Sequence, residues 1–501
     1  MTTTTERATT SDGGIAHFDV VIVGAGISGI GSAVHLQTQR PERSFVVLEA
    51  KDGYGGTWHT HRYPGIRSDS DLYTFGFRFK PWTSAPIATA EEIQKYLGEV
   101  IDERGLNDHI RYGHRIESAS WSSAEQRWTV HARRGERELV HFSANFLWMC
   151  QGYYRHAEGY TPEWPGMERF KGRIVHPQSW PDDLDYRDNE VVVIGSGATA
   201  ATLIPAMADD VAHVTMLQRS PTYFFTGENR DALADQLREL DVPEEWVHDI
   251  IRRQNLKILR DLTNLALEEP EFAKEALIDL VRASLPPGYD VERHFTPSYM
   301  PWRQRIAFLP DGDLFKAITS GQASVVTDEI ETFTEDGIRL KSGEELLADI
   351  IVTATGFNLS VLGDIAFTID DAPLDLAESV TYRGMMFSGV PNLVWIFGYF
   401  RASWTLRVDI LGDFTCRLLA HMDELGATSV TPQLRAQDRE ADVLAWINPD
   451  YFNPGYLMRS MHLMPKRLDR PEWQHSQDYW MERDTLPSVD LDDGCLIFER
   501  Q

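Results

Sequence analysis

Two glycine-rich segments carry residue types and spacings that suit phosphate binding. Residues 24–29 read G-A-G-I-S-G and residues 195–200 read G-S-G-A-T-A, so both fit the pattern G-x-G-x-x-G/A. The glycines allow a tight turn and a close approach of the backbone to a pyrophosphate, and the N-terminus of the following helix attracts its charge. The sequence therefore predicts two dinucleotide sites, built from Gly24, Gly26 and Gly29 and from Gly195, Ser196, Gly197, Thr199 and Ala200.

The side chains that follow the second strand of each unit differ in charge. Glu49 ends the strand of the first unit, where a carboxylate accepts hydrogen bonds from ribose hydroxyls. Arg219 and Ser220 stand at the corresponding place in the second unit, and a guanidinium suits a 2′-phosphate. We therefore assign the first site to FAD and the second to NADPH rather than NADH. The alternative for Arg219 is a solvated surface charge.

Short apolar, β-branched runs on either side of both loops predict the elements that position them. The expected elements are a strand at 19–23, a helix to about Gln39, a strand at 45–48, a strand at 191–194, a helix to about Met207 and a strand at 214–217. Pro205 is expected to kink the second helix. Each set forms a βαβ unit of a parallel sheet.

The fold class predicted from these units is α/β, with two Rossmann-like dinucleotide-binding domains, for FAD and NADPH, and a helical insertion in the NADPH domain. Residues rich in Leu, Glu, Arg and Ala at helical spacing indicate the insertion, which we expect to help roof the substrate cavity. The expected divisions are a disordered tail (1–17), the first part of the FAD domain (18–157), a linker (158–189), the NADPH domain (190–356) with its insertion (about 231–290), and the second part of the FAD domain with the C-terminal segment (357–501).

Composition excludes several classes of function. The 501-residue chain has a formal net charge of −28, which disfavours nucleic acid and anionic membranes as partners. No apolar run approaches the length of a membrane span, and we expect a cytoplasmic protein. The three cysteines, Cys150, Cys416 and Cys495, form no C-x-x-C pair, so neither a redox disulfide nor a metal site is expected.

Between the two loops, residues 170–181 read F-K-G-R-I-V-H-P-Q-S-W-P. This segment resembles the fingerprint F-x-G-x-x-x-H-x-x-x-W-P of type I Baeyer–Villiger monooxygenases, whose N- and S-oxygenating relatives usually carry Tyr in place of Trp180. Residues 55–58 (G-G-T-W) and 62–69 (R-Y-P-G-I-R-S-D) are also similar to family segments. The fingerprint positions are Phe170, Gly172, His176, Trp180 and Pro181.

The resemblance extends from about residue 18 to about residue 487 and is strongest to the ethionamide-activating monooxygenase branch. The segments that carry it are residues 66–71, 176–178, 217–223 and 402–406. It implies FAD and NADPH as cofactors, and a small ketone or sulfur compound and O2 as substrates. The implied reaction inserts one oxygen atom into a ketone through a C4a-peroxide of the flavin and gives an ester or lactone. Members of the branch also oxygenate sulfur, including that of thioamides.

The resemblance also implies roles for individual residues. Arg305 matches the active-site arginine, with Arg303 as its rival, and Asp69 matches the acid that orients it. Many family members place Lys directly before this arginine, where this chain has Gln304, so the preference for NADPH depends more on Arg219. Gly56, Thr57 and Trp58 are assigned to the FAD site, His176 to the positioning of the domains, and Trp404 and Leu406 to the wall of the substrate cavity.

Two other reaction classes share these cofactors. A heteroatom monooxygenase would oxygenate nitrogen or sulfur but no ketone. An NADPH-dependent flavin disulfide reductase would use a cysteine pair, which this sequence lacks. A flavoprotein without catalytic activity is the third alternative.

Overall fold

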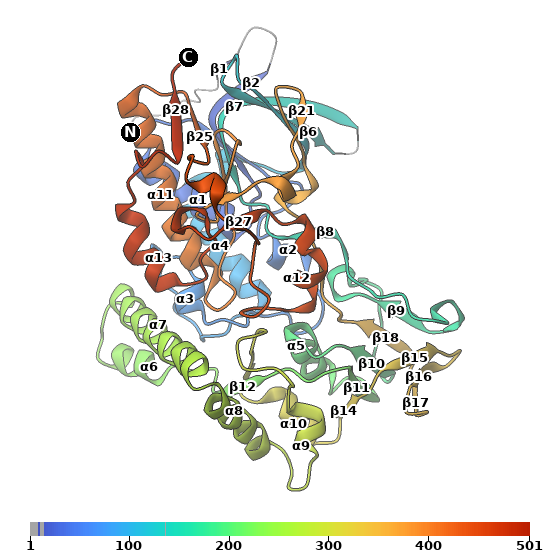
Figure 1. Ribbon diagram of the computed structural model, residues 1–501. Coiled ribbons are helices and arrows are strands. Elements are labelled where there is room, and N and C mark those ends of the chain that lie inside the picture. The colour runs from blue at the N-terminus through green and yellow to red at the C-terminus, as the bar shows by residue number, and fades with distance from the viewer. Residues whose placement is uncertain (1–8, 11–14, 136) are drawn as a thin grey trace.

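A large mixed sheet forms the upper part of the molecule in Figure 1. The computed structural model describes residues 9–10, 15–135 and 137–501. Within these residues the strands of the large sheet are β1 (Thr9–Thr10), β2 (Ala16–Val23), β3 (Phe45–Leu48), β4 (Ile110–Arg111), β5 (His114–Ser122), β6 (Arg127–Arg134), β7 (Glu138–Met149), β20 (Ala366–Ile369), β21 (Ala372–Pro373) and β24 (Leu393–Trp395). Their order is β21-β20-β5-β6-β7-β2-β3-β4, while β1 pairs with β2 and β24 pairs with β7.

The tail predicted over residues 1–17 lies mostly outside the described residues, which omit 1–8 and 11–14. Thr9–Thr10 pair with β2 in antiparallel register. Strand β2 begins at Ala16 and so starts earlier than the apolar run at 19–23 indicates. The reason is that Ala16 and His17 extend the parallel pairing with β7.

Residues 20–23 of β2 are buried on both faces of the sheet, as their uninterrupted apolar sequence predicts. Val20 and Ile22 belong to one core cluster, and Val21 and Val23 to another, because successive side chains of a strand point to opposite faces. The first cluster holds the helices α1 (Ile27–Gln39), α4 (Ala90–Glu103) and α11 (Trp404–Leu425) against the sheet. Helix α1 ends where the sequence predicts.

A smaller, wholly parallel sheet forms the lower part of the molecule (Figure 1). Its strands are β9 (Arg173–Val175), β10 (Glu190–Ile194), β11 (His213–Gln218), β14 (Ala323–Thr327) and β18 (Ile350–Thr353), in the order β14-β11-β10-β18-β9. Helix α5 (Ala198–Met207) continues through Pro205, and α9 (Val291–Phe295) and α10 (Asp313–Thr319) pack nearby. The α/β class with two dinucleotide-type βαβ units is confirmed.

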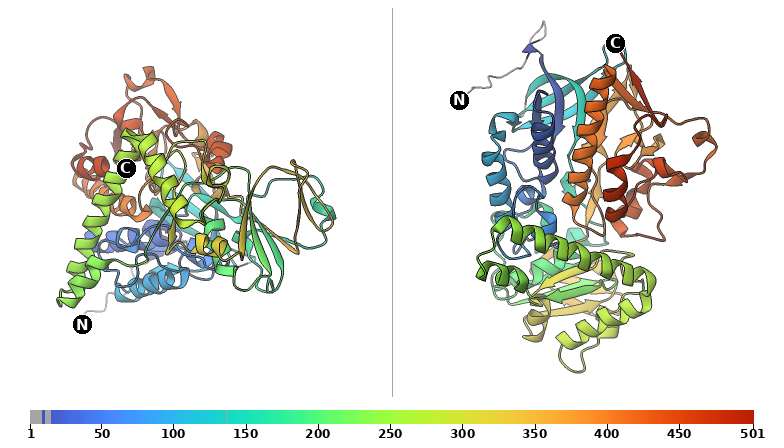
Figure 2. Two further views of the ribbon diagram at one scale, coloured as in Figure 1. Left: turned by 90° about the horizontal axis from the view of Figure 1, so that it is seen from below. Right: turned by 90° about the vertical axis from the view of Figure 1, so that its left-hand side faces the viewer.

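Three helices connect the two parts: α6 (Ala232–Glu239), α7 (Glu244–Glu268) and α8 (Pro270–Ser284). They lie in the range predicted for the insertion, and α7, in green, runs along the junction in the right-hand view of Figure 2. Val247 and Ile251 of α7 join the core of the large sheet, whereas Ile278 and Val281 of α8 join the core of the small one. The insertion therefore bridges both domains.

The chain passes between the two domains at two places, after β7 and after β18. Strand β8 (Tyr154–Gly159) follows β7 and pairs with β19 (Phe357–Leu359), which follows β18. The remaining elements are α2 (Thr57–Thr60), α3 (Leu72–Phe75), α12 (Gly455–Ser460), α13 (Tyr479–Thr485), β12 (Phe224–Gly227), β13 (Ala307–Pro310), β15 (Ile330–Phe333), β16 (Gly337–Leu340), β17 (Glu345–Leu347), β22 (Thr381–Tyr382), β23 (Met386–Phe387), β25 (Ser429–Pro432), β26 (Val443–Ala445), β27 (Lys466–Leu468) and β28 (Leu496–Glu499). None of the helices described is long and apolar enough to cross a membrane.

Candidate active site

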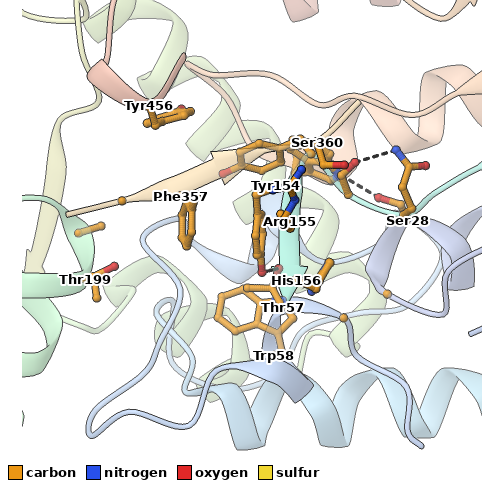
Figure 3. Close-up of a pocket in the computed structure, with 18 of the residues that line it drawn as sticks. Ser28, Thr57, Trp58, Tyr154, Arg155, His156, Thr199, Phe357, Ser360 and Tyr456 are labelled. Carbon is orange, nitrogen blue, oxygen red and sulfur yellow. Dashed lines mark hydrogen bonds between the residues drawn. The ribbon is translucent and has the colours of Figure 1, made fainter. Parts of the chain in front are cut away.

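One cavity of about 920 Å³ lies where the two sheets meet. Parallel strands end there, which is where open α/β sheets bind their ligands. Figure 3 shows part of its lining. The predicted residues that line it are Gly24, Gly26, Glu49, Gly56, Thr57, Trp58, Asp69, Gly195, Ser196, Gly197, Thr199, Arg219, Ser220 and Arg305.

The first glycine loop is shaped by backbone contacts that only glycine permits. Gly24 has φ +99°, a left-handed conformation, and a Cβ on Gly29 would lie 1.8 Å from the carbonyl oxygen of Gly24. Gly29 does not line the cavity but lets α1 pack closely on β2. Gly26 faces Gly56, whose Cα lies 3.5 Å from the position of an added Cβ. The loop therefore leaves its backbone open on the cavity side, as a pyrophosphate requires.

Glu49 holds this loop together. Its two carboxylate oxygens accept hydrogen bonds from the backbone N–H groups of Ala25, at 2.7 Å, and Lys51, at 2.8 Å. A carboxylate has about four lone-pair positions, so capacity remains for a ribose hydroxyl. Glu49 thus stabilises the backbone of the loop, which the sequence did not predict, in addition to the predicted hydrogen bond to a ribose.

The second loop is more open than the first. Gly195 has φ +132°, and an added Cβ would lie 2.3 Å from the carbonyl oxygen of Ala354. At Gly197 an added Cβ would meet no atom within 4 Å. Ser196 Oγ donates to the carbonyl oxygen of Ser220 at 3.0 Å, which fixes the second residue after β11. The free N-terminus of α5 and this open space fit a phosphate group.

Two arginines stand beside the second loop. Arg219 is exposed and has no ion pair or hydrogen bond among the described residues. Arg459 lines the same cavity, and its guanidinium lies 3.5 Å from the centroid of the Tyr160 ring. Burial lowers the pKa of Arg459; Tyr160 acts in the opposite direction, and the positive charge of Arg219 lowers the pKa further. An anion at this end of the cavity would relieve the repulsion between the two arginines.

Arg305 and Asp69 form an ion pair that faces the cavity. Arg305 Nε and Nη2 donate to the two carboxylate oxygens at 2.6 and 2.9 Å, Nη2 also donates to Ser70 Oγ at 3.1 Å, and Nη1 donates to the carbonyl oxygen of Phe400 at 3.3 Å. A guanidinium has five N–H donors, so one Nη1–H remains for a bound molecule. Burial lowers the pKa of Arg305, but Asp69 outweighs it and raises the pKa above its usual value. Arg305 therefore stays charged.

Aromatic side chains from several segments form the cavity wall. The Tyr154 hydroxyl lies 3.0 Å from both Thr57 Oγ1 and His61 Nε2, and its ring stacks on Phe357 with centroids 4.5 Å apart. Burial, with the charge of His156 as a smaller cause, lowers the pKa of His61 to about 4, so that imidazole is neutral. Figure 3 shows Trp58 on the side of the cavity opposite Tyr456.

The fingerprint residues lie outside the cavity. His176 Nδ1 accepts from the N–H of Gln178 at 3.1 Å, so its proton sits on Nε2, which lies 3.2 Å from the carbonyl oxygen of Gly356. Burial lowers the pKa of His176. The ring therefore ties the linker to the crossing at Gly356, and a Cβ on Gly159 would lie 1.9 Å from it. No proton transfer at the cavity is assigned to His176.

The other fingerprint positions are packing residues. Phe170 is buried against Phe333, and an added Cβ on Gly172 would lie 2.1 Å from the carbonyl oxygen of Asp349. Trp180 packs edge-on against Tyr186. Pro181 and Ala200 also do not line the cavity, and Ala200 is fully buried.

Two expectations about the wall need correction. Trp404 lines the cavity, but Leu406 is buried beside Tyr399 and Ala402 in a separate cluster. None of residues 231–290 lines the cavity, because Leu256 and Leu259 of α7 pack behind the wall residues instead. The insertion supports the wall from outside.

Several lining residues were not predicted. They are Tyr153, Tyr154, His156, Ser360, Phe400, Phe452, Tyr456 and Arg459. Tyr153 and Tyr154 follow the carboxyl end of β7, which runs parallel to β2, a position that favours ligand contact. His156 lies on β8, Tyr456 and Arg459 lie on α12, and Ser360, Phe400 and Phe452 lie on irregular segments, and no sequence period indicates that these segments approach the cavity. Arg303, the rival of Arg305, does not line the cavity.

Comparisons with known proteins agree with this architecture. A model of the NAD(P)-binding Rossmann-like domain matches residues 22–84, and a flavin-binding monooxygenase-like model matches residues 85–231. The FAD-containing monooxygenase EthA of Mycolicibacterium smegmatis is 46% identical over 487 residues, which cover 97% of both chains. The probable FAD-binding monooxygenase AlmA of Acinetobacter baylyi is 44% identical over 97% of both chains.

Solved structures share the fold at lower identity. An oxidised steroid monooxygenase bound to NADP superimposes with a TM-score of 0.75 at 22% identity, over 97% of this chain and all of that one (100%). A cyclohexanone-bound cyclohexanone monooxygenase gives a TM-score of 0.75 at 19% identity, over 96% of this chain and 99% of the other. Both therefore share the overall fold of this chain.

Proposed function

This chain belongs to the FAD-containing monooxygenases, and from that premise we propose that it is an NADPH-dependent Baeyer–Villiger monooxygenase. The proposed reaction inserts one oxygen atom of O2 into a small ketone and gives an ester or lactone. The observation that carries the proposal is the charged Arg305, held by Asp69 with one free Nη1–H beside the cavity.

The cavity fits FAD at the first loop and NADPH at the second. Gly24, Gly26 and Glu49 would hold the pyrophosphate and ribose of FAD, and Gly56, Thr57 and Trp58 would contact its ring system. When bound, FAD supplies the transfer of electrons from NADPH to dioxygen.

Gly195, Ser196, Gly197 and Thr199 would receive the pyrophosphate of NADPH, with Arg219 at the 2′-phosphate and Ser220 beside it. The lack of a carboxylate at the end of β11 removes the group that would repel this phosphate. Because this chain has Gln304 where many family members have Lys, the positive charge for the 2′-phosphate would come from Arg219, with Arg459 in the same cavity.

Arg305 would stabilise the negative charge that develops on oxygen when the ketone carbonyl is attacked. Asp69 would orient the guanidinium, because both of its oxygens are engaged with it. The aromatic wall would exclude water, which strengthens this electrostatic contribution. His176 would keep the linker fixed to the second crossing.

Product analysis tests this proposal directly. Purified holoprotein is incubated with NADPH and air and with a panel of ketones and thioethers. We expect ester from at least one ketone together with NADPH consumption. Sulfoxide without ester across the whole panel would instead identify a heteroatom monooxygenase. The three cysteines are buried and unpaired, which gives no support to a disulfide reductase.

A further inference from the structure

Two tyrosine hydroxyls face the cavity without a hydrogen-bond partner among the described residues. Tyr153 follows strand β7 and Tyr456 lies on helix α12. Both residues line the cavity, and neither hydroxyl oxygen is among the fully buried side-chain atoms that lack a hydrogen-bond partner. The adjacent Tyr154 differs, because its hydroxyl is engaged by Thr57 and His61. Tyrosine hydroxyls in protein interiors normally have partners, so these two are available to a ligand.

The rings that carry these hydroxyls are held in place. Tyr153 stacks on Trp404 with centroids 5.3 Å apart, and Trp404 Nε1 donates to Ser28 Oγ at 2.8 Å. Tyr456 meets Tyr153 with centroids 6.5 Å apart. A donor whose ring is fixed loses little conformational entropy when it binds a ligand.

Both hydroxyls are close to Arg305 and remain protonated. Burial raises the pKa of Tyr153 and of Tyr456, while the positive charge of Arg305 lowers both to a smaller extent. Near neutral pH the two phenols therefore act as hydrogen-bond donors. Tyr153, Tyr456 and Arg305 all line the same cavity.

We propose that the hydroxyls of Tyr153 and Tyr456 donate hydrogen bonds to the carbonyl oxygen of a neutral ketone and make the site prefer a ketone over a thioether. This inference rests on the proposed function, because Arg305 marks the reacting end of the cavity. A carbonyl oxygen accepts two hydrogen bonds, whereas a thioether sulfur is a weak acceptor. A site built to bond an oxygen discriminates against a molecule that leaves its donors unpaired.

A matched pair of probes isolates this effect. 4-Phenyl-2-butanone and methyl 2-phenylethyl sulfide differ only in the carbonyl group and the sulfur atom. Their phenylethyl and methyl groups can therefore make the same contacts with the aromatic wall. The double variant Tyr153→Phe/Tyr456→Phe keeps both rings and removes both hydroxyls. Tyr289→Phe is the control, because the Tyr289 hydroxyl also has no hydrogen-bond partner in the part of the chain that the structure describes, but Tyr289 does not line the cavity. FAD content and thermal unfolding establish that each variant is folded.

Two quantities are measured: the dissociation constant of each probe for the oxidised holoenzyme with NADP⁺, and the ratio of kcat/KM for ketone to that for sulfide. Loss of each bond should weaken ketone binding by about three- to tenfold. The double variant should lower the ratio at least as much, leave sulfide binding unchanged and match the wild type in flavin reduction. The control should behave as the wild type.

Unchanged ketone binding in the double variant, or an equal loss for both probes, would overturn the inference while leaving ester formation by the wild type intact. If the wild type formed no ester but still bound the ketone through these hydroxyls, the proposed function would fail and the inference would stand. The two claims are therefore separable.

Discussion

The guanidinium of Arg305 combines a fixed charge with a free donor. Three of its contacts orient it, through Asp69, Ser70 and the carbonyl group of Phe400. Replacing Arg305 with Ala should lower kcat for ketone conversion by about 100- to 1,000-fold, by analogy with the loss of an oxyanion donor. Reduction of FAD by NADPH should persist, as stopped-flow absorbance can show. Arg303→Ala is the control, and normal ketone turnover in Arg305→Ala would remove the residue from the mechanism.

Arg219 is the residue that we expect to bind the 2′-phosphate of NADPH. Its side chain is unpaired among the described residues and lies at the open second loop. Arg219→Ala should raise the dissociation constant of NADPH by about 10- to 100-fold, because a charged hydrogen bond to phosphate is lost. NADH binding should not change. Fluorescence titration of both nucleotides measures this, with Arg339→Ala, in a remote ion pair with Glu331, as control. If the variant bound NADPH and NADH more weakly by the same factor, Arg219 would not lie at the 2′-phosphate.

At the scale of elements, helix α7 is anchored by a buried arginine. Arg252 Nη1 donates to the carbonyl oxygens of Tyr73, Thr74 and Gly76, and Nη2 lies 3.5 Å from Asp409 Oδ2. Arg252→Ala should destabilise the protein by about 3–5 kcal/mol, because it leaves Asp409 buried with less compensation.

Thermal unfolding and hydrogen exchange in α7 measure this effect. The neighbouring Arg253→Ala is the control, since Arg253 is exposed and, within the described residues, forms an ion pair only with Asp249 on the same helix. Unchanged exchange in α7 of the Arg252 variant would show that the insertion does not depend on this anchor.

Helices α1 and α11 are joined by a histidine with a pH-dependent contribution. His35 Nε2 lies 2.9 Å from Asp409 Oδ1 and Nδ1 lies 3.4 Å from Asp413. Burial opposes protonation, but the bonds to the two aspartates outweigh it and raise the pKa of His35 above 6.5. The stabilisation is therefore complete below pH 6.5 and is lost as the pH rises through the folded-state pKa.

Comparison of the wild type with His35→Gln tests whether the stabilisation by His35 decreases as the pH rises. The difference in unfolding temperature between the two proteins should be larger at about pH 6 than at a pH above the folded-state pKa of His35. A difference in unfolding temperature that stays constant or increases with pH would contradict a raised pKa of His35.

The elements nearest the glycine loops are those that the sequence predicts best. Strands β2, β3, β10 and β11 and helices α1 and α5 follow from local apolar runs and from loop chemistry. The early start of β2 depends on pairing with β7, more than a hundred residues away in sequence, which no local pattern contains. The double anchoring of the insertion depends in the same way on distant partners such as Tyr73 and Asp409.

At the scale of the whole molecule, the cavity exists only because both chain crossings bring the two sheets together. Motif residues from both loops line it, which the two-fold repetition of the loop predicts. Tyr456 and Phe452 enter from the C-terminal segment, whose approach to Arg305 is a property of the fold alone. The fingerprint residues lie outside the cavity because their side chains hold the linker against the second sheet.

The source of the inserted oxygen tests the central claim most directly. Holoprotein, NADPH and 4-phenyl-2-butanone are incubated under 18O-labelled dioxygen, and the products are examined by mass spectrometry. The account predicts 2-phenylethyl acetate that carries one labelled oxygen atom, formed as NADPH is consumed. NADPH oxidation that yields only hydrogen peroxide, with no labelled ester from this or any other ketone tested, would contradict it.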